Sequence, residues 1–164
     1  MSLQGLFAAL TSKGLYLATA ESLTGGLVGA AITDEPGASK VYLGGVTAYT
    51  SQIKSQFLGV SQALLENQGA VDAEVAAQMA EGVRQKFSTK AGISTEKVIG
   101  LATTGVAGPD VQDGKSVGTV FLAIAGIPGV GAVVYEHSFD GDRKSIRNQS
   151  VSELLQHLRE QILD

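Results

Sequence analysis

The chain has 164 residues, of which 44% are hydrophobic and 17% charged, a composition that excludes a disordered protein and fits one domain with a substantial core. A net charge of −4 without a long basic run argues against a nucleic-acid partner, and the lack of cysteine excludes disulfides, a thiolate nucleophile and a cysteine-ligated zinc site. No apolar run reaches the roughly 18–20 residues of a membrane span and no signal-peptide pattern opens the chain, so we expect a cytoplasmic protein with no membrane partner.

Helical and strand patterns mostly alternate in the first half of the chain, and a hairpin precedes the last helix. Gly44 and Gly45 interrupt a strand of β-branched and aromatic residues and indicate a bulge or a close approach, while Ser61 and Asp72 have the chemistry of helix N-caps. In chain order the expected elements are a helix over 2–13, a strand over 15–20, a helix over 24–33, a strand over 40–50, helices over 51–58, 61–67 and 72–88, a strand over 97–105, an exposed loop over 106–116, paired strands over 117–126 and 131–139, and a helix from 141 to the end. This order predicts one α/β layered domain over residues 1–164, with helices covering a mixed sheet.

Three polar segments that contain glycine follow predicted strands, at Glu21–Gly26, Ala48–Lys54 and Thr103–Gly108. In open α/β sheets, ligands bind beyond the carboxyl ends of parallel strands. If these three strands run parallel, their exits share one edge of the sheet, and that edge is where we expect the functional site.

The segment TAESLTGG (19–26) places Ser22 where a strand gives way to a helix. The hydroxyl is either a helix cap or a nucleophile whose oxyanion is stabilised by the backbone N–H groups of Thr24, Gly25 and Gly26. A phosphate cradle is a third use of such a helix start, although the segment lacks the G-x-x-x-x-G-K-[ST] spacing of a P-loop. We expect the neighbouring Glu21 to have a structural role.

A serine nucleophile needs a base, and the two histidines are poorly placed to supply one. We expect an ordinary strand position for His137 and a solvated helix surface for His157. Lys54 is the better candidate, because burial lowers the pKa of a lysine toward neutrality, and Tyr49 could orient the amine or relay a proton. The alternative is a surface lysine and a core tyrosine.

Two further groups suit a ribose, a phosphate or an amide. The turn TTGVAGPD (103–110) offers Thr104 and the backbone of Gly105 and Gly108, although a plain loop has the same composition. Arg143 and Arg147 lie four residues apart at the start of the last helix, where they either bind a phosphate or carboxylate or form salt bridges with neighbouring acids. No carboxylate or histidine cluster has metal-ligand spacing, so we expect no metal and no cofactor.

Six blocks occur in an order that resembles the C-terminal domain of the competence/damage-inducible CinA family, the nicotinamide-nucleotide amidases. They are TAESLTGG, GGVTAYTSQIKSQFLGV, GAVDAEVAAQMAEGVR, TTGVAGPD, SVGTVFLAIA and FDGDRKSIR. The resemblance runs from about Leu6 to the last helix, and it is to the stand-alone form of the domain. It implies a three-layer α/β/α fold with a mixed, mostly parallel sheet and a homo-oligomeric assembly.

The resemblance also implies a reaction: hydrolysis of nicotinamide mononucleotide to nicotinic acid mononucleotide and ammonia, within pyridine-nucleotide salvage. On this basis Ser22 is the nucleophile, Lys54 is the base and Tyr49 is the associated tyrosine, while Thr104 and Arg143 belong to the blocks that bind the substrate.

Two positions depart from the family pattern. Leu23 stands where the family often has cysteine, and the loop after AGP reads DVQDGKSVGTV, with fewer glycines than is usual. Two other functions fit the same residues: a non-catalytic nucleotide-binding or regulatory module, and a serine amidase acting on another small amide. Retention of Ser22, Tyr49 and Lys54 favours an enzyme, and Arg143 favours a phosphorylated small-molecule nucleotide substrate.

Overall fold

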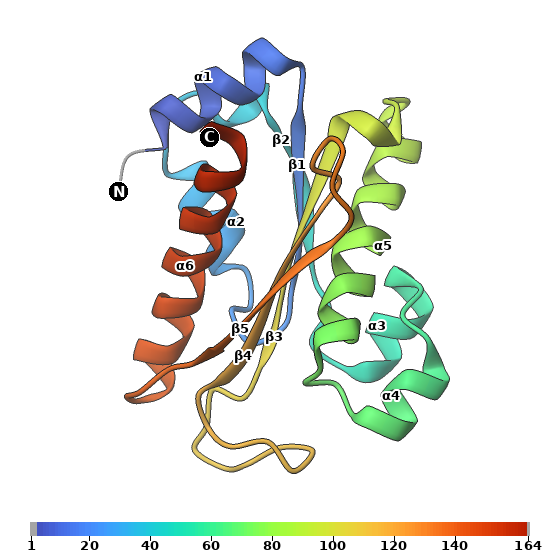
Figure 1. Cartoon of the computed structure of the whole chain (residues 1–164), viewed down its shortest axis with the longest axis vertical. Coiled ribbons are helices and arrows are strands. Elements are labelled where there is room, and N and C mark those ends of the chain that lie inside the picture. Colours follow the sequence, from blue (N-terminus) through green and yellow to red (C-terminus); the bar gives the residue numbers. More distant parts are fainter. Residues whose placement is uncertain (1–2, 164) are drawn as a thin grey trace.

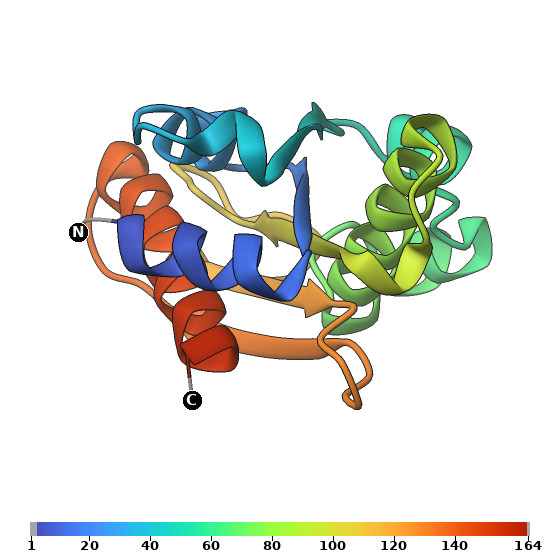
Figure 2. The same cartoon turned by 90° about the horizontal axis from the view of Figure 1, so that it is seen from above.

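A five-stranded sheet lies between two layers of helices in the computed structural model, which describes residues 3–163 (Figure 1, Figure 2). In chain order the elements are α1 (Gln4–Lys13), β1 (Tyr16–Glu21), α2 (Leu27–Thr33), the 3-10 helix η1 (Ala38–Lys40), β2 (Tyr42–Thr47), α3 (Ser51–Leu58), α4 (Gln62–Gln68), α5 (Ala73–Ala91), the 3-10 helix η2 (Thr95–Lys97), β3 (Val98–Gly105), β4 (Thr119–Ala125), β5 (Val133–Ser138) and α6 (Arg143–Leu163). The predicted α/β layered fold is confirmed. Within residues 3–163, no helix combines the length and the apolarity that crossing a membrane requires.

The sheet is mixed, and its strand order is β2-β1-β3-β4-β5. Strand β1 pairs in parallel with both β2 and β3, whereas β4 is antiparallel to β3 and to β5. Four of the five strands therefore point the same way, and the carboxyl ends of β1, β2, β3 and β5 lie at one edge of the sheet. This is the edge at which the functional site was expected.

Each face of the sheet has its own apolar core. Helices α1, α2 and α6 cover one face, where Leu6, Leu10 and Leu154 are buried against the large side chains of the strands. Helix α5 covers the other face together with α3 and α4, and there Ala18 and Ala102 present small side chains to it. Small residues on the strands allow the long helix α5 to lie close to β1, β3 and β4.

The glycine pair in β2 has both of the expected uses. The register between β1 and β2 skips one residue just before Gly44, which is the predicted bulge. A Cβ on Gly45 would lie 2.0 Å from Thr19 Oγ1, an atom that instead hydrogen-bonds the Tyr42 hydroxyl at 2.7 Å. A side chain at position 45 would therefore separate β2 from β1.

The predicted helix caps are also confirmed. The Ser61 hydroxyl accepts a hydrogen bond from the Leu64 N–H at 3.3 Å, at the start of α4. The Asp72 carboxylate accepts from the N–H groups of Glu74 and Val75 at 2.8 and 3.4 Å, at the start of α5. These caps satisfy N–H groups that a helix end leaves without partners.

Candidate active site

A cavity of about 290 Å³ lies at the carboxyl-end edge of the sheet and is lined in part by the loop that joins β3 to β4. The path of this loop is seen in Figure 1. The exits of β1, β2 and β3 all contribute to it, so the prediction that they share one edge is confirmed. The lining residues are Ser22, Leu23, Tyr49, Thr50, Ala70, Val71, Thr104, Gly105, Val106, Ala107, Gly108, Asp110, Gln112 and Arg143.

Ser22 and Lys54 form a direct pair in this site. Lys54 Nζ lies 2.9 Å from Ser22 Oγ, although the two residues are 32 positions apart in the sequence. Ser22 follows β1 directly and is 8% exposed, and Lys54 enters from the first turn of α3 with 1% of its surface exposed. The alternative of a surface lysine is therefore wrong.

The Lys54 amine is held by backbone oxygens and has a depressed pKa. Nζ donates to the carbonyl oxygens of Ala48 at 2.9 Å and Tyr49 at 3.4 Å. Burial lowers the pKa of Lys54 from 10.5 to about 8, because a buried ammonium loses its hydration, while the negative charge of Asp113 acts in the opposite direction. The neutral amine required of a base is accordingly much easier to form here than on an exposed lysine.

Glu21 shapes the turn that carries the serine. Its carboxylate accepts three backbone hydrogen bonds, from Gly26 and Val28 at 2.9 and 3.0 Å through Oε2, and from Gly29 at 2.8 Å through Oε1. These bonds cover the amino end of α2, so the predicted structural role of Glu21 is confirmed. The helix begins at Leu27 rather than at residue 24, because the preceding residues fold as a turn in which both glycines have positive φ.

Two of the three predicted oxyanion donors are engaged inside this turn. The Gly25 N–H donates to the Ser22 carbonyl oxygen at 3.1 Å, and the Gly26 N–H donates to Glu21. In this structure the N–H groups of Gly25 and Gly26 therefore have partners within the turn and do not point to an oxyanion. In contrast, no hydrogen bond from the N–H of Leu23 or Thr24 is found within residues 3–163.

Arg147 fixes the orientation of the peptides beside the serine. It donates to the Leu23 carbonyl at 2.8 Å and to the Thr24 carbonyl at 2.9 Å. In a trans peptide the N–H points away from the C=O, so the bond to Leu23 turns the Thr24 N–H away from the arginine. On the other side of the turn, Thr103 accepts the Ser22 N–H at 3.0 Å and its hydroxyl meets that of Thr24 at 2.8 Å.

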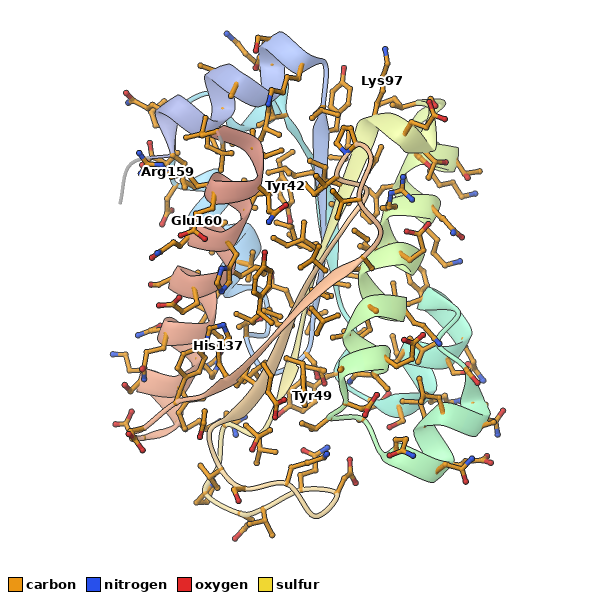
Figure 3. The ribbon with its side chains drawn as sticks, viewed as in Figure 1. Tyr42, Tyr49, Lys97, His137, Arg159 and Glu160 are labelled. Carbon is orange, nitrogen blue, oxygen red and sulfur yellow. The ribbon has the colours of Figure 1, made fainter. Side chains whose placement is uncertain are left out.

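Tyr49 and Arg143 meet at the mouth of the cavity. Tyr49 is 59% exposed and follows the end of β2 (Figure 3), so its predicted alternative as a core residue is wrong. Its hydroxyl accepts from Arg143 at 3.0 Å, and the same guanidinium donates to the Gly108 carbonyl at 2.7 Å. The hydrogen bond between Lys54 and this residue runs to the Tyr49 backbone oxygen, whereas the phenol hydroxyl bonds Arg143.

The β3–β4 loop is tied down over the cavity. Thr104, the predicted ligand residue, is buried and donates its hydroxyl to the Ala70 carbonyl at 2.6 Å, which leaves its oxygen as an acceptor. Asp113 accepts the Ala70 N–H at 2.9 Å. The prediction of an exposed loop is wrong at its start, where Val106 and Ala107 are buried.

Three residues that position the site were missed or misread in the sequence. The sequence predicts Arg147 as an anion ligand or a salt-bridge partner, yet it holds backbone carbonyls, and it predicts Thr103 only as part of a ligand-binding turn. No role is predicted for Asp113 from the sequence, although an Asp-Gly pair within a glycine-containing loop indicates a residue in the left-handed region, where Asp113 lies with φ of 50°.

The two histidines do not line the cavity. His137 lies on β5, as predicted. His157 was expected on a solvated helix surface, but its side chain is 16% exposed and stacks on Tyr135 with ring centroids 3.7 Å apart. That expectation is wrong because the edge strand β5 covers this side of α6.

Comparison with known proteins identifies the family. Residues 2–162 match the model described as the CinA C-terminal domain. The chain belongs to this family. A putative competence-damage inducible protein of Desulforamulus reducens is 45% identical over 89% of the chain, and a CinA-like protein of Frankia casuarinae is 41% identical over 96%. These alignments cover 33% and 34% of the two relatives, so the chain spans about a third of their length.

Solved structures of CinA-family proteins share the fold. The competence/damage inducible protein CihA of Agrobacterium tumefaciens superposes with a TM-score of 0.84 at 32% identity, covering 96% of this chain and 92% of that one. A CinA superfamily protein of Klebsiella pneumoniae gives 0.82 at 30% identity, with 95% and 92% covered. The predicted homo-oligomer and cytoplasmic location stay predictions.

Proposed function

We propose that this CinA-family domain is a serine amidase that hydrolyses the carboxamide of nicotinamide mononucleotide to the carboxylate and ammonia. The observation that carries the proposal is the 2.9 Å contact between Ser22 Oγ and the Nζ of a lysine that is 1% exposed. A structural serine cap does not need a buried amine, whereas a serine nucleophile needs a base within hydrogen-bonding distance.

The carbonyls around Lys54 orient its neutral form. A neutral amine has two hydrogens and one lone pair. When the hydrogens are donated to the oxygens of Ala48 and Tyr49, the lone pair faces Ser22 Oγ. The serine proton then moves to Nζ as Oγ attacks the carboxamide carbon, which gives a tetrahedral oxyanion and a Lys54 ammonium.

The oxyanion is stabilised by the N–H groups of Leu23 and Thr24 in this proposal. Leu23 directly follows the nucleophile, a position from which serine hydrolases supply a backbone donor. Arg147 and the hydroxyl of Thr103 hold the turn, so the donors are oriented before substrate binds. Lys54 returns its proton to the leaving nitrogen and ammonia departs, after which a water, deprotonated by the same amine, hydrolyses the ester on Ser22.

The substrate phosphate is assigned to Arg143. Two of its five N–H donors are used by Tyr49 and Gly108, which fixes the guanidinium at the cavity mouth and leaves the other donors for a ligand. Anchoring a remote phosphate positions the amide over Ser22, so part of the phosphate binding energy is used to accelerate the reaction.

The proposal is tested by ammonia release from nicotinamide mononucleotide and from nicotinamide riboside, which lacks the phosphate. We expect release from both, with kcat/KM at least about 10-fold higher for the mononucleotide because of its contacts to Arg143. Equal rates on the riboside and on other small amides would favour the general amidase. Binding of the mononucleotide without ammonia release would favour the regulatory module instead.

A further inference from the structure

Two histidines and a glutamate meet between strand β5 and helix α6, outside the cavity described above. One of them, His137, is labelled in Figure 3. His137 Nε2 lies 3.1 Å from His157 Nε2, and one ligand atom from each histidine and from Glu153 all lie within 4.8 Å of one another. All three side chains are half-buried.

The sequence does not reveal this cluster because its members come from two elements. Alternation along β5 turns Tyr135 and His137 to the face covered by α6. On α6, Glu153 and His157 are four residues apart and therefore share one face of the helix. The expectation of no metal rests on spacing along the chain, and such spacing does not show which residues of a strand lie beside which residues of a helix.

We propose that His137, Glu153 and His157 bind one divalent transition-metal ion of the zinc class. Two imidazoles and one carboxylate are a ligand set that such ions accept, with a fourth position left for water. Two nitrogens on a tetrahedral ion at about 2.0–2.1 Å are about 3.4 Å apart, within a few tenths of an ångström of the distance found here. Rotation about the bonds of the glutamate side chain closes the remaining gap.

The surroundings orient both imidazoles. Tyr135 stacks on His157 at an interplanar angle of 3°, and Phe139 stacks on His137 with centroids 4.9 Å apart. His157 Nδ1 is buried without a hydrogen-bond partner among the described residues, and Glu160 Oε2 lies 3.5 Å from it. A carboxylate beside the second ring nitrogen is the usual partner of a metal-bound histidine, because it fixes the tautomer that leaves the other nitrogen free for the ion.

The ion would join β5, the edge strand, to the last helix. Because α6 begins at Arg143 and carries Arg147, the same helix also reaches the candidate active site, but the three ligands take no part in the proposed chemistry. The expected effect of the metal is therefore on stability, and it is independent of whether the amidase proposal holds.

The test is a titration of the tag-free chain with Zn²⁺ alone by calorimetry, and with Co²⁺ by visible absorption. The chain contains only two histidines and no cysteine, so histidine-bound cobalt reports on these residues. We expect one ion per chain, and at hundredfold excess over Kd a rise in Tm of about 5–10 °C. His137→Asn and His157→Asn should each weaken binding at least about 100-fold, and Glu153→Gln about 10-fold.

Glu136→Gln is the matched control, because Glu136 is an exposed carboxylate next to His137 that alternation places on the other side of the strand. It should bind the ion as the wild type does. The Tm of each variant in chelator shows whether it is folded, and His137→Asn keeps the test valid if removal of the stacked His157 ring prevents folding. The proposal is overturned if the wild type shows no saturable binding, or if both histidine variants bind the ion as tightly as the wild type does.

Discussion

Replacing Arg147 with alanine removes the two hydrogen bonds that hold the carbonyls of Leu23 and Thr24. Hydrogen bonds from a charged donor contribute about 1.5–3 kcal/mol each when water is excluded. Arg147 is only half-buried, and water can replace it at both oxygens, so we expect a combined loss of about 3 kcal/mol. For a chain of this length that corresponds to a Tm lower by about 6–12 °C.

The larger consequence is expected in turnover. Without Arg147 the peptide between Leu23 and Thr24 can rotate, and the Thr24 N–H no longer has a fixed direction. Loss of one oxyanion donor typically lowers kcat about 10²–10³-fold, and a donor that is misdirected part of the time should cost about 10–100-fold. The KM for nicotinamide mononucleotide should change little, because the substitution leaves Arg143, the proposed phosphate ligand, in place.

The assay is steady-state ammonia release, measured at least 15 °C below the Tm of the variant so that the enzyme stays folded. Arg147→Lys should fall between the wild type and the alanine variant, since one ammonium keeps the charge but lacks the guanidinium fork that reaches two carbonyls. Arg159→Ala, an exposed arginine on the same helix (Figure 3), is the matched control and should stay within about 0.5 kcal/mol of wild type. A folded Arg147→Ala enzyme with kcat within twofold of wild type would refute this account of the turn.

Three further predictions concern the charges of the site. kcat/KM should rise as pH increases through about 8, where Lys54 loses its proton. The free energy of unfolding of the wild type should also rise relative to that of Lys54→Met between about pH 8 and 10.5, because in this range the lysine is protonated only in the unfolded chain. A difference in unfolding free energy that does not change with pH, measured by chemical denaturation, would contradict this. Asp113→Asn should move the rate profile to lower pH, since the carboxylate raises the pKa of Lys54, whereas Asp110→Asn should not; an alkaline shift would show that the sign is wrong. Arg143→Ala should raise the KM for the mononucleotide about 10–100-fold but leave the riboside unchanged, and equal losses on both substrates would place the phosphate elsewhere.

Much of the fold could be predicted because local patterns and tertiary structure agree. Apolar spacing and caps such as Asp72 place the helices, and β-branched runs place the strands. The start of α2 could not be placed correctly, because Glu21 reaches forward to the N–H groups of Gly26, Val28 and Gly29 and holds the intervening residues as a turn. That competition between a side chain and the helix is decided by three-dimensional geometry.

The candidate site could also be predicted only in part. Ser22 and Lys54 could be identified as candidates from their residue types and their positions after predicted strands, and the parallel pairing of β1 with β2 and β3 brings them together. The partners of individual polar atoms could not be predicted, since the Tyr49 hydroxyl bonds Arg143 rather than the Lys54 amine, and Arg147 bonds carbonyls rather than acids. Such choices depend on distances between segments more than 90 residues apart.

The most direct test of the central claim is ammonia release by Ser22→Ala beside the wild type, with binding of nicotinamide mononucleotide measured on the same preparations. The variant lacks only one buried oxygen, so it should fold and bind the nucleotide. The account predicts release by the wild type and a loss of at least about 10³-fold in the variant, as expected when a nucleophile is removed. Ammonia release by folded Ser22→Ala at the wild-type rate would contradict it.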